Sequence, residues 1–182
     1  MTEKNLHIVA AAKARFMRYG YAKTTMGDIA EEAGIARQTL YNAYANKDEI
    51  LRVVVRDVGQ ATLNKVEEAW GTADSFSEKL TQFHELVPIM WYEEIRKAPD
   101  WAELLEGVHK AAAEVVCVLD ADWVAALERV MRDHAPARSA EEISEMAEFF
   151  YVTSLNAKHG VTDTDHLRRV LATVRKATLA LL

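Results

Sequence analysis

Apolar residues recur at intervals of three and four along the whole chain, and no segment alternates convincingly between apolar and polar positions. The first pattern is typical of one face of an α-helix, whereas alternation would indicate a strand. We therefore predict an all-α protein of about nine helices. The expected helices cover residues 5–19, 25–33, 37–44, 46–70, 76–98, 101–118, 120–134, 139–159 and 164–182. Around Asp120 a new helix could begin, or the preceding one could continue.

Helix-starting and helix-breaking residues place the boundaries. Only seven glycines and three prolines interrupt the chain, which favours long helices. Thr25 followed by Asp28, and Ser139 followed by Glu142, have the spacing of capping boxes at helix N-termini. Pro88 has no backbone N–H, so we expect the helix that contains it to kink there. That kink could open a pocket or could only bend the helix around the core.

Residues 26–43 have the spacing of a helix-turn-helix. Such a unit needs a small residue where its helices approach, a glycine in the turn, and apolar residues between the helices. When the unit is numbered from Met26, Ala30 is the small residue at position five and Gly34 is the turn glycine at position nine, free to take positive φ. The inward-facing sites hold Ile29, Ala33, Ile35, Leu40 and Ala43. Few random helical pairs would satisfy both the alanine and the glycine positions.

The same region resembles the N-terminal domain of the tetracycline-repressor (TetR) family. The resemblance is carried by Phe16-Met17-x-Tyr19-Gly20-Tyr21-x-x-Thr24-Thr25, Asp28-Ile29-Ala30-x-x-Ala33-Gly34-Ile35 and Thr39-Leu40-Tyr41-x-x-Tyr44-x-Asn46-Lys47-Asp48-Glu49-Ile50-Leu51. It covers residues 6–52 and implies a three-helix helix-turn-helix domain at 1–52, followed by a helical ligand-binding and dimerisation domain at 53–182. Two positions depart from the family. Ala36 replaces the usual Ser or Thr N-cap, which should weaken the third helix by ~1 kcal/mol, and Tyr44 replaces a common Phe.

The resemblance implies a transcription regulator, most often a repressor, that binds an operator in double-stranded DNA. Positions where the family contacts phosphates hold Thr25, Thr39, Tyr41 and Lys47. Positions from which the recognition helix reaches base edges hold Arg37, Gln38 and Asn42. Arginine favours guanine, whereas glutamine and asparagine favour adenine. Two alternatives stay open: Arg37 and Gln38 could be merely solvated, and Tyr41 could pack against the first helix, with or without a phosphate contact.

Charge is distributed unevenly along the chain, whose formal net charge is −6. Residues 1–52 hold eight Lys or Arg against six Asp or Glu, a net +2, while the remainder holds fourteen against twenty-two, a net −8. Because the local field governs an encounter with a phosphate backbone, this asymmetry weakly favours a DNA-binding head on an acidic body.

One head buries too little surface for tight, specific DNA binding, so we expect two heads on a palindromic operator. Residues 143–155 are apolar around much of the helix, more than a surface helix needs, and residues 167–181 carry a second apolar stripe. We therefore predict a homodimer through residues 140–159 and 164–182, the two helices that the resemblance also implies. The alternative is that these stripes belong to an ordinary monomer core.

The resemblance also implies a small-molecule inducer, which would bind among the central helices, shift the long fourth helix and release DNA. Aromatic residues are concentrated in the middle third of the chain, as an apolar pocket with a few polar groups would require. The candidate lining residues are His84, Val87, Trp91, His109, Trp123 and Phe150. For each of them, plain core packing is the alternative. No feature identifies the ligand.

No motif indicates an enzyme: the chain has no Gly-rich phosphate loop, zinc-protease motif, paired-cysteine motif or nucleophile elbow. Cys117 lies in an apolar run and is expected to be buried, and the histidines are too scattered for a metal site, so we expect neither metal nor cofactor. A signal-peptide pattern and a membrane-spanning apolar run are both missing, which favours a cytoplasmic protein. The remaining alternatives are a helix-turn-helix-derived protein-interaction module and, less favoured, an α-helical enzyme.

Overall fold

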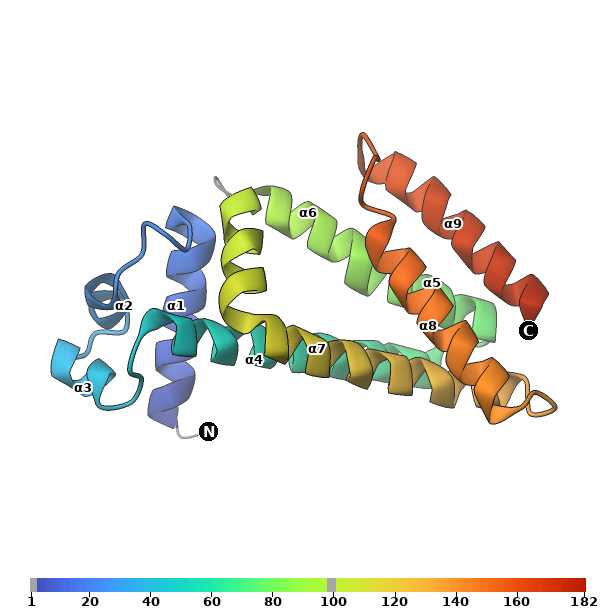
Figure 1. The fold of residues 1–182 in the computed structure, drawn as a ribbon, viewed down its shortest axis with the longest axis horizontal. Coiled ribbons are helices and arrows are strands. Elements are labelled where there is room, and N and C mark those ends of the chain that lie inside the picture. Colours follow the sequence, from blue (N-terminus) through green and yellow to red (C-terminus); the bar gives the residue numbers. More distant parts are fainter. Residues whose placement is uncertain (1–2, 98–100) are drawn as a thin grey trace. The chain divides into compact units, whose positions relative to one another are not determined.

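The computed structural model describes residues 3–97 and 101–182, without the side chains of residues 4, 95, 101–105 and 109. Within these ranges the regular secondary structure is entirely helical, which confirms the predicted all-α class (Figure 1). The helices are α1 (Glu3–Tyr19), α2 (Met26–Glu32), α3 (Arg37–Tyr41), α4 (Lys47–Thr72), α5 (Phe76–His84), α6 (Met90–Lys97), α7 (Trp101–His134), α8 (Ala140–Asn156) and α9 (Thr164–Leu181), with a π-helical turn, η1 (Glu85–Ile89), between α5 and α6. None of the described helices is long and apolar enough to cross a membrane.

The chain forms two compact units, and helices α4 and α7 contribute to both. The first unit comprises residues 1–60 and 94–119, and the second comprises residues 61–93 and 120–182. Each unit has a core of its own, so each is described separately.

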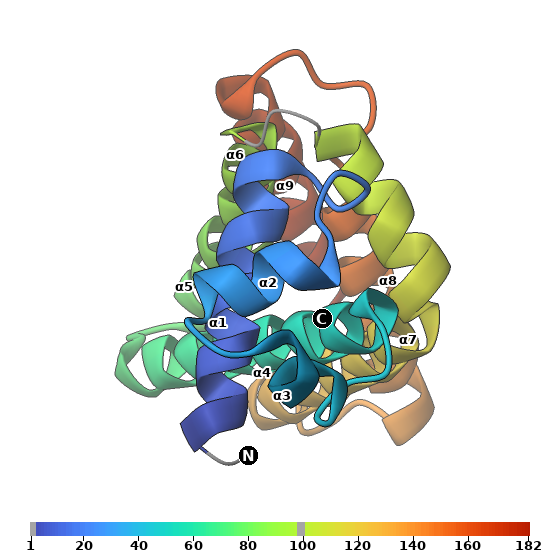
Figure 2. The same ribbon diagram turned by 90° about the vertical axis from the view of Figure 1, so that its left-hand side faces the viewer.

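The core of the first unit joins α1, α2, α3 and the start of α4. Its buried residues include Phe16, Ile29, Leu40 and Ile50. Figure 2 faces this end of the chain and shows α2 and α3 following α1. Helix α3 is shorter than predicted, because the N–H groups of both Ala43 and Tyr44 turn back to the carbonyl of Leu40. Tyr44 is therefore a buried residue of the turn after the helix rather than its last residue.

Helix α7 is continuous through Asp120, so the preceding helix continues there and no new one begins. The departure from helical geometry lies earlier, at Ala112, with φ −129° and ψ 16°. The run that contains Cys117 is only partly buried: Val115 is buried, whereas Cys117 and Val118 are exposed. The expectation that Cys117 is a core residue is wrong, because helical periodicity turns one side of any apolar run outward.

The core of the second unit brings together α4, α5, α7, α8 and α9. Its largest fully buried side chains include Phe83, Phe150, Leu127 and Met131. The disruption expected at Pro88 takes the form of the π-helical turn, in which the Met90 N–H donates to the carbonyl of Glu85. A wider turn accommodates the proline ring and its missing N–H within an otherwise helical segment.

Candidate nucleic-acid interface

Helices α2 and α3 form a helix-turn-helix, and a capping box lies at the N-terminus of α2. The hydroxyl of Thr25 accepts a hydrogen bond from the N–H of Asp28 at 3.2 Å, and the carboxylate of Asp28 accepts one from the N–H of Thr25 at 2.8 Å. The two hydrogen bonds that this carboxylate accepts, from the N–H of Thr25 and from its hydroxyl at 2.8 Å, lower the pKa of Asp28 because they favour the charged form. The box fixes the first residue of α2.

The turn between the two helices depends on Gly34, whose φ is +62°. The N–H of Ile35 donates to the carbonyl of Ala30 at 3.0 Å, and Ala30 and Leu40 are buried where the helices meet. At the start of α3, Ala36 is an extended N-cap without a side-chain hydrogen bond. The recognition helix therefore lacks the capping interaction that α2 has.

Three exposed side chains of α3 and its C-cap form one polar surface. Nε2 of Gln38 donates to Oδ1 of Asn42 at 3.0 Å, so these two amides form a pair one helical turn apart. Arg37 is also exposed, and its guanidinium lies over Gly27 of α2: a Cβ at Gly27 would lie 2.8 Å from Nη2 of Arg37. The three predicted base-reading residues thus extend from one short helix, each held by a contact within the same unit.

The four predicted phosphate-contacting residues are arranged differently from one another. Tyr41 is 51% exposed and Thr39 is half-buried, on the same helix as Arg37 and Gln38. The Thr25 hydroxyl is engaged in the capping box. Lys47, at the first position of α4, directs its ammonium into the turn before α2, where Nζ lies 2.9 Å from the carbonyl oxygen of Tyr21.

Comparisons with known proteins agree with this geometry. Residues 8–54 match the family model described as "Bacterial regulatory proteins, tetR family". The chain is 31% identical over 86 residues to the uncharacterized HTH-type transcriptional regulator YfiR of Bacillus subtilis (strain 168), a match that covers 44% of this chain and 42% of YfiR. The matched sequence thus spans less than half the length of that curated relative.

Similarity of fold extends over nearly the whole chain. A transcriptional regulator from Cytophaga hutchinsonii ATCC 33406 superimposes with a TM-score of 0.74 at 17% identity, covering 98% of each chain. SmeT, the repressor of the Stenotrophomonas maltophilia multidrug efflux pump SmeDEF, superimposes with a TM-score of 0.64 at 23% identity, covering 97% of this chain and 88% of SmeT. Residues 8–54 thus match the tetR-family domain, and the chain as a whole has the fold of these solved regulators.

Most of the predicted effector residues pack against one another in the second unit. His84, Val87, Trp123 and Phe150 are buried, and Trp91 is partly buried against the same core. The side chain of His109 lies outside the described residues. The His84 ring stacks on Phe150 with centroids 4.9 Å apart, so these two candidates are in direct contact.

Two residues of the matched region 8–54 were not predicted as site residues, although Tyr21 is among those that carry the family resemblance. Gly27 provides the space that the Arg37 guanidinium occupies, and Tyr21 lies beneath the Lys47 ammonium. A glycine at the second position of a short helix is an unfavourable helix former, and this was a signal that a neighbour needs the space. The position of Tyr21, directly after the turn glycine Gly20, carried no comparable signal.

Proposed function

We propose that this chain is a cytoplasmic, ligand-responsive transcriptional repressor that binds a palindromic DNA operator as a homodimer. The observation that carries the proposal is the exposed polar surface of α3, where Arg37 and the paired amides of Gln38 and Asn42 extend from a tetR-type helix-turn-helix. In this proposal residues 1–52 form the DNA-binding domain and residues 53–182 form the regulatory and dimerisation domain.

The direct test is binding to the DNA that flanks the gene of this protein, followed by fluorescence anisotropy. We expect Arg37→Ala to weaken binding and to reduce discrimination at one or two base pairs, at about 1–3 kcal/mol for a lost bidentate contact. Specific binding that is unchanged in Arg37→Ala would remove that residue from the readout. A wild-type chain that binds no DNA would favour a protein-interaction module instead.

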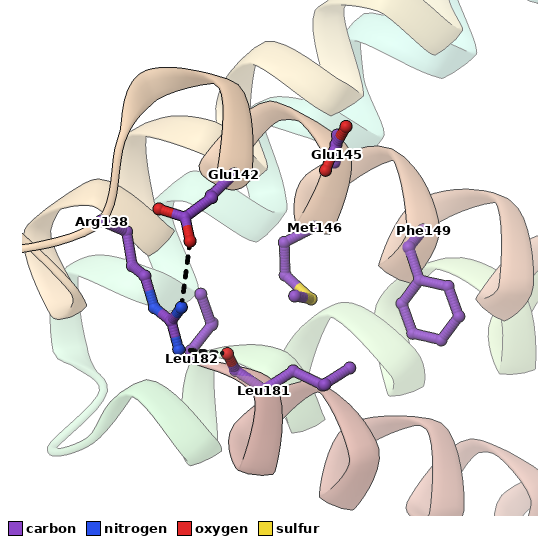
Figure 3. Close-up of a pocket in the computed structure, with 7 residues that line it drawn as sticks. All are labelled: Arg138, Glu142, Glu145, Met146, Phe149, Leu181 and Leu182. Atoms are coloured by element: carbon purple, nitrogen blue, oxygen red, sulfur yellow. Dashed lines mark hydrogen bonds and ion pairs between the residues drawn. The ribbon is translucent and has the colours of Figure 1, made fainter.

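The homodimer is supported by exposed apolar side chains on the last two helices. Phe149, Val152 and Leu181 are 43%, 47% and 50% exposed, although all three are large and apolar. Figure 3 shows Phe149 and Met146 of α8 beside Leu181 of α9, at the rim of a groove of about 360 Å³. An apolar surface of this kind is typical of a protein–protein interface.

Arg138 closes one end of that groove. It pairs with Glu142 at 3.1 Å and donates to the carbonyl of Leu181 at 2.8 Å, which ties the end of α9 to the start of α8. In the proposed dimer this ion pair lies at the polar rim around the apolar centre. We expect Phe149→Lys to convert the dimer to monomer in light scattering at micromolar concentration. Val118→Lys, at an apolar position of α7 that is 60% exposed, is the matched control and should stay dimeric.

The proposed effector is an apolar small molecule with one polar group. The core that contains His84, Val87, Trp123 and Phe150 is closely packed, so a ligand would have to part these side chains, together with Trp91. One polar partner within this core is the pair formed by His84 and Ser154. Solved complexes of similar fold contain triclosan in SmeT and lauroyl-CoA, whose acyl chain is apolar, in Thermus thermophilus FadR, which supports a ligand with an apolar part.

A thermal-shift screen of apolar and aromatic compounds tests the effector proposal. A true effector should raise the Tm of the wild-type chain and lower its affinity for DNA, because it must favour the conformation that fits DNA poorly. Trp123→Ala should lose the thermal shift. Compounds that raise the Tm of the wild type and of this variant equally would place the effector elsewhere.

A further inference from the structure

The ammonium of Lys47 lies within the turn that connects α1 to α2. Its Nζ donates to three backbone carbonyls, those of Tyr21 at 2.9 Å, Ala22 at 3.3 Å and Thr24 at 3.2 Å. A lysine ammonium has three N–H donors, and here each has a carbonyl acceptor within the protein. Reaching a DNA phosphate would therefore require giving up contacts that the free protein already makes.

The aromatic ring of Tyr21 forms the other side of this ammonium site. Nζ of Lys47 lies 4.3 Å from the ring centroid, within the range of a cation–π interaction. The Tyr21 hydroxyl donates to the carboxylate of Asp48, the residue after Lys47, and its ring contacts that of Phe16 at a centroid distance of 5.4 Å. Two adjacent side chains of the first turn of α4, the cationic Lys47 and the anionic Asp48, thus bind the turn after α1.

Helix α7 also limits the space around the Tyr21 ring. A Cβ on Gly107 of α7 would lie 2.7 Å from Cδ1 of Tyr21, so the ring rests directly on the backbone of that helix. Because Asp48, Lys47 and Gly107 contact different parts of Tyr21, the ring has little freedom to move away from the ammonium.

Residues 21–24, which Lys47 contacts, lead directly into α2 and α3, the helices proposed to face DNA. Thr24 is buried, and its hydroxyl donates to the carbonyl of Gly20 at 2.8 Å. Thr25, the next residue, is the N-cap of α2. A change in the path of residues 21–24 would therefore move the start of α2, and with it the attached helix α3.

We infer that Lys47 is a positioning residue, whose ammonium holds residues 21–24 against the first turn of α4 so that α2 and α3 keep the orientation that DNA requires. Its charge is used within the protein and replaces no counterion on the DNA backbone. The expected effect on DNA affinity rests on the proposed DNA-binding function. The contacts of the Lys47 ammonium with residues 21–24 are made in the free protein.

The test compares Lys47→Arg and Lys47→Met with Lys13→Met, which removes the same charge from an exposed position on α1. Lys47→Arg separates the loss of charge from the loss of hydrogen bonds. It keeps the positive charge, but its planar guanidinium cannot direct donors to three carbonyls around one point. In the free protein, we expect both Lys47 variants to speed hydrogen exchange at the Thr24 amide, which donates to the Tyr21 carbonyl at 3.3 Å, and to lower Tm. Lys13→Met should match the wild type.

With operator DNA, both Lys47 variants should bind about tenfold more weakly, while the slope of log K against log salt stays at the wild-type value. A lost phosphate contact would instead reduce that slope by about 0.9. A reduced slope in Lys47→Met, together with wild-type exchange at Thr24 and wild-type affinity in Lys47→Arg, would overturn the inference. If the wild type binds no DNA, the proposed function fails. The hydrogen-exchange and Tm results still decide whether Lys47 holds residues 21–24 in the free protein.

Discussion

We expect the buried pair formed by His84 and Ser154 to make the stability of the protein depend on pH. Nε2 of His84 lies 2.9 Å from Oγ of Ser154, and both side chains are buried. The imidazole stacks on Phe150 and meets the edge of Phe83 at a centroid distance of 6.1 Å. Burial, with a smaller contribution from the charge of Arg175, lowers the pKa of His84 to about 3.

The sign and size of the effect follow from linkage between protonation and unfolding. An exposed histidine in the unfolded chain has a pKa of about 6.5, so as pH falls below that value the unfolded state binds a proton that the folded state still excludes. The neutral imidazole therefore contributes its full stability above about pH 7, and this contribution is lost progressively as pH falls toward the folded-state pKa. Between pH 7.5 and 5.0 we expect His84 to remove about 2 kcal/mol from the free energy of unfolding.

Urea unfolding followed by circular dichroism at these two pH values, at one fixed protomer concentration, measures the loss. His84→Phe should lose about 2 kcal/mol less than the wild type over this range, because the carboxylates that titrate in both proteins cancel in the comparison. His159→Gln, a substitution of an exposed histidine on the segment after α8, should follow the wild type. Equal losses in the wild type and in His84→Phe would refute the argument, since they would mean that the folded state accepts a proton on His84 without penalty.

Three further substitutions or reactions test local features of the first unit. Ala36→Ser should add about 1 kcal/mol to the free energy of unfolding in urea, because it supplies the missing N-cap of α3; Ala36→Val, which cannot cap, should add nothing. Gly27→Ala should raise Tm slightly through helix propensity while displacing the Arg37 guanidinium, so anisotropy should show weaker operator binding from a protein that is no less stable. Cys117 should react with a water-soluble disulfide reagent in the native state as fast as in urea, and a protected thiol would contradict its exposure.

Local signals in the sequence were sufficient to predict the start of several helices and the helix-turn-helix itself. The pairs Thr25 with Asp28 and Ser139 with Glu142 both form capping boxes, because the interaction needs only residues three positions apart. The turn at Gly34 was predictable for the same reason, since its positive φ is a property of one residue.

Features that depend on distant residues could not be predicted in this way. Ala112 is a favourable helix former, yet it leaves helical geometry where Nη1 of Arg52 donates to the carbonyl of Ala111 at 3.0 Å, a contact between residues 59 positions apart. Lys47 reaches carbonyls more than twenty positions earlier in the chain. No local signal indicates these contacts, because they depend on how residues 21–24 fold against the first turn of α4.

The same contacts bear on how this head would select DNA. Arg37 lies over Gly27, and Gln38 is hydrogen-bonded to Asn42 before any DNA is present. Side chains that are already ordered lose less conformational entropy on binding, so a correct base pair gains more of the interaction free energy. The amide pair also implies that the two readers are coupled: removing Asn42 frees Gln38 to adopt other rotamers. The effects of Gln38→Ala and Asn42→Ala on operator affinity should therefore add to more than the effect of the double substitution.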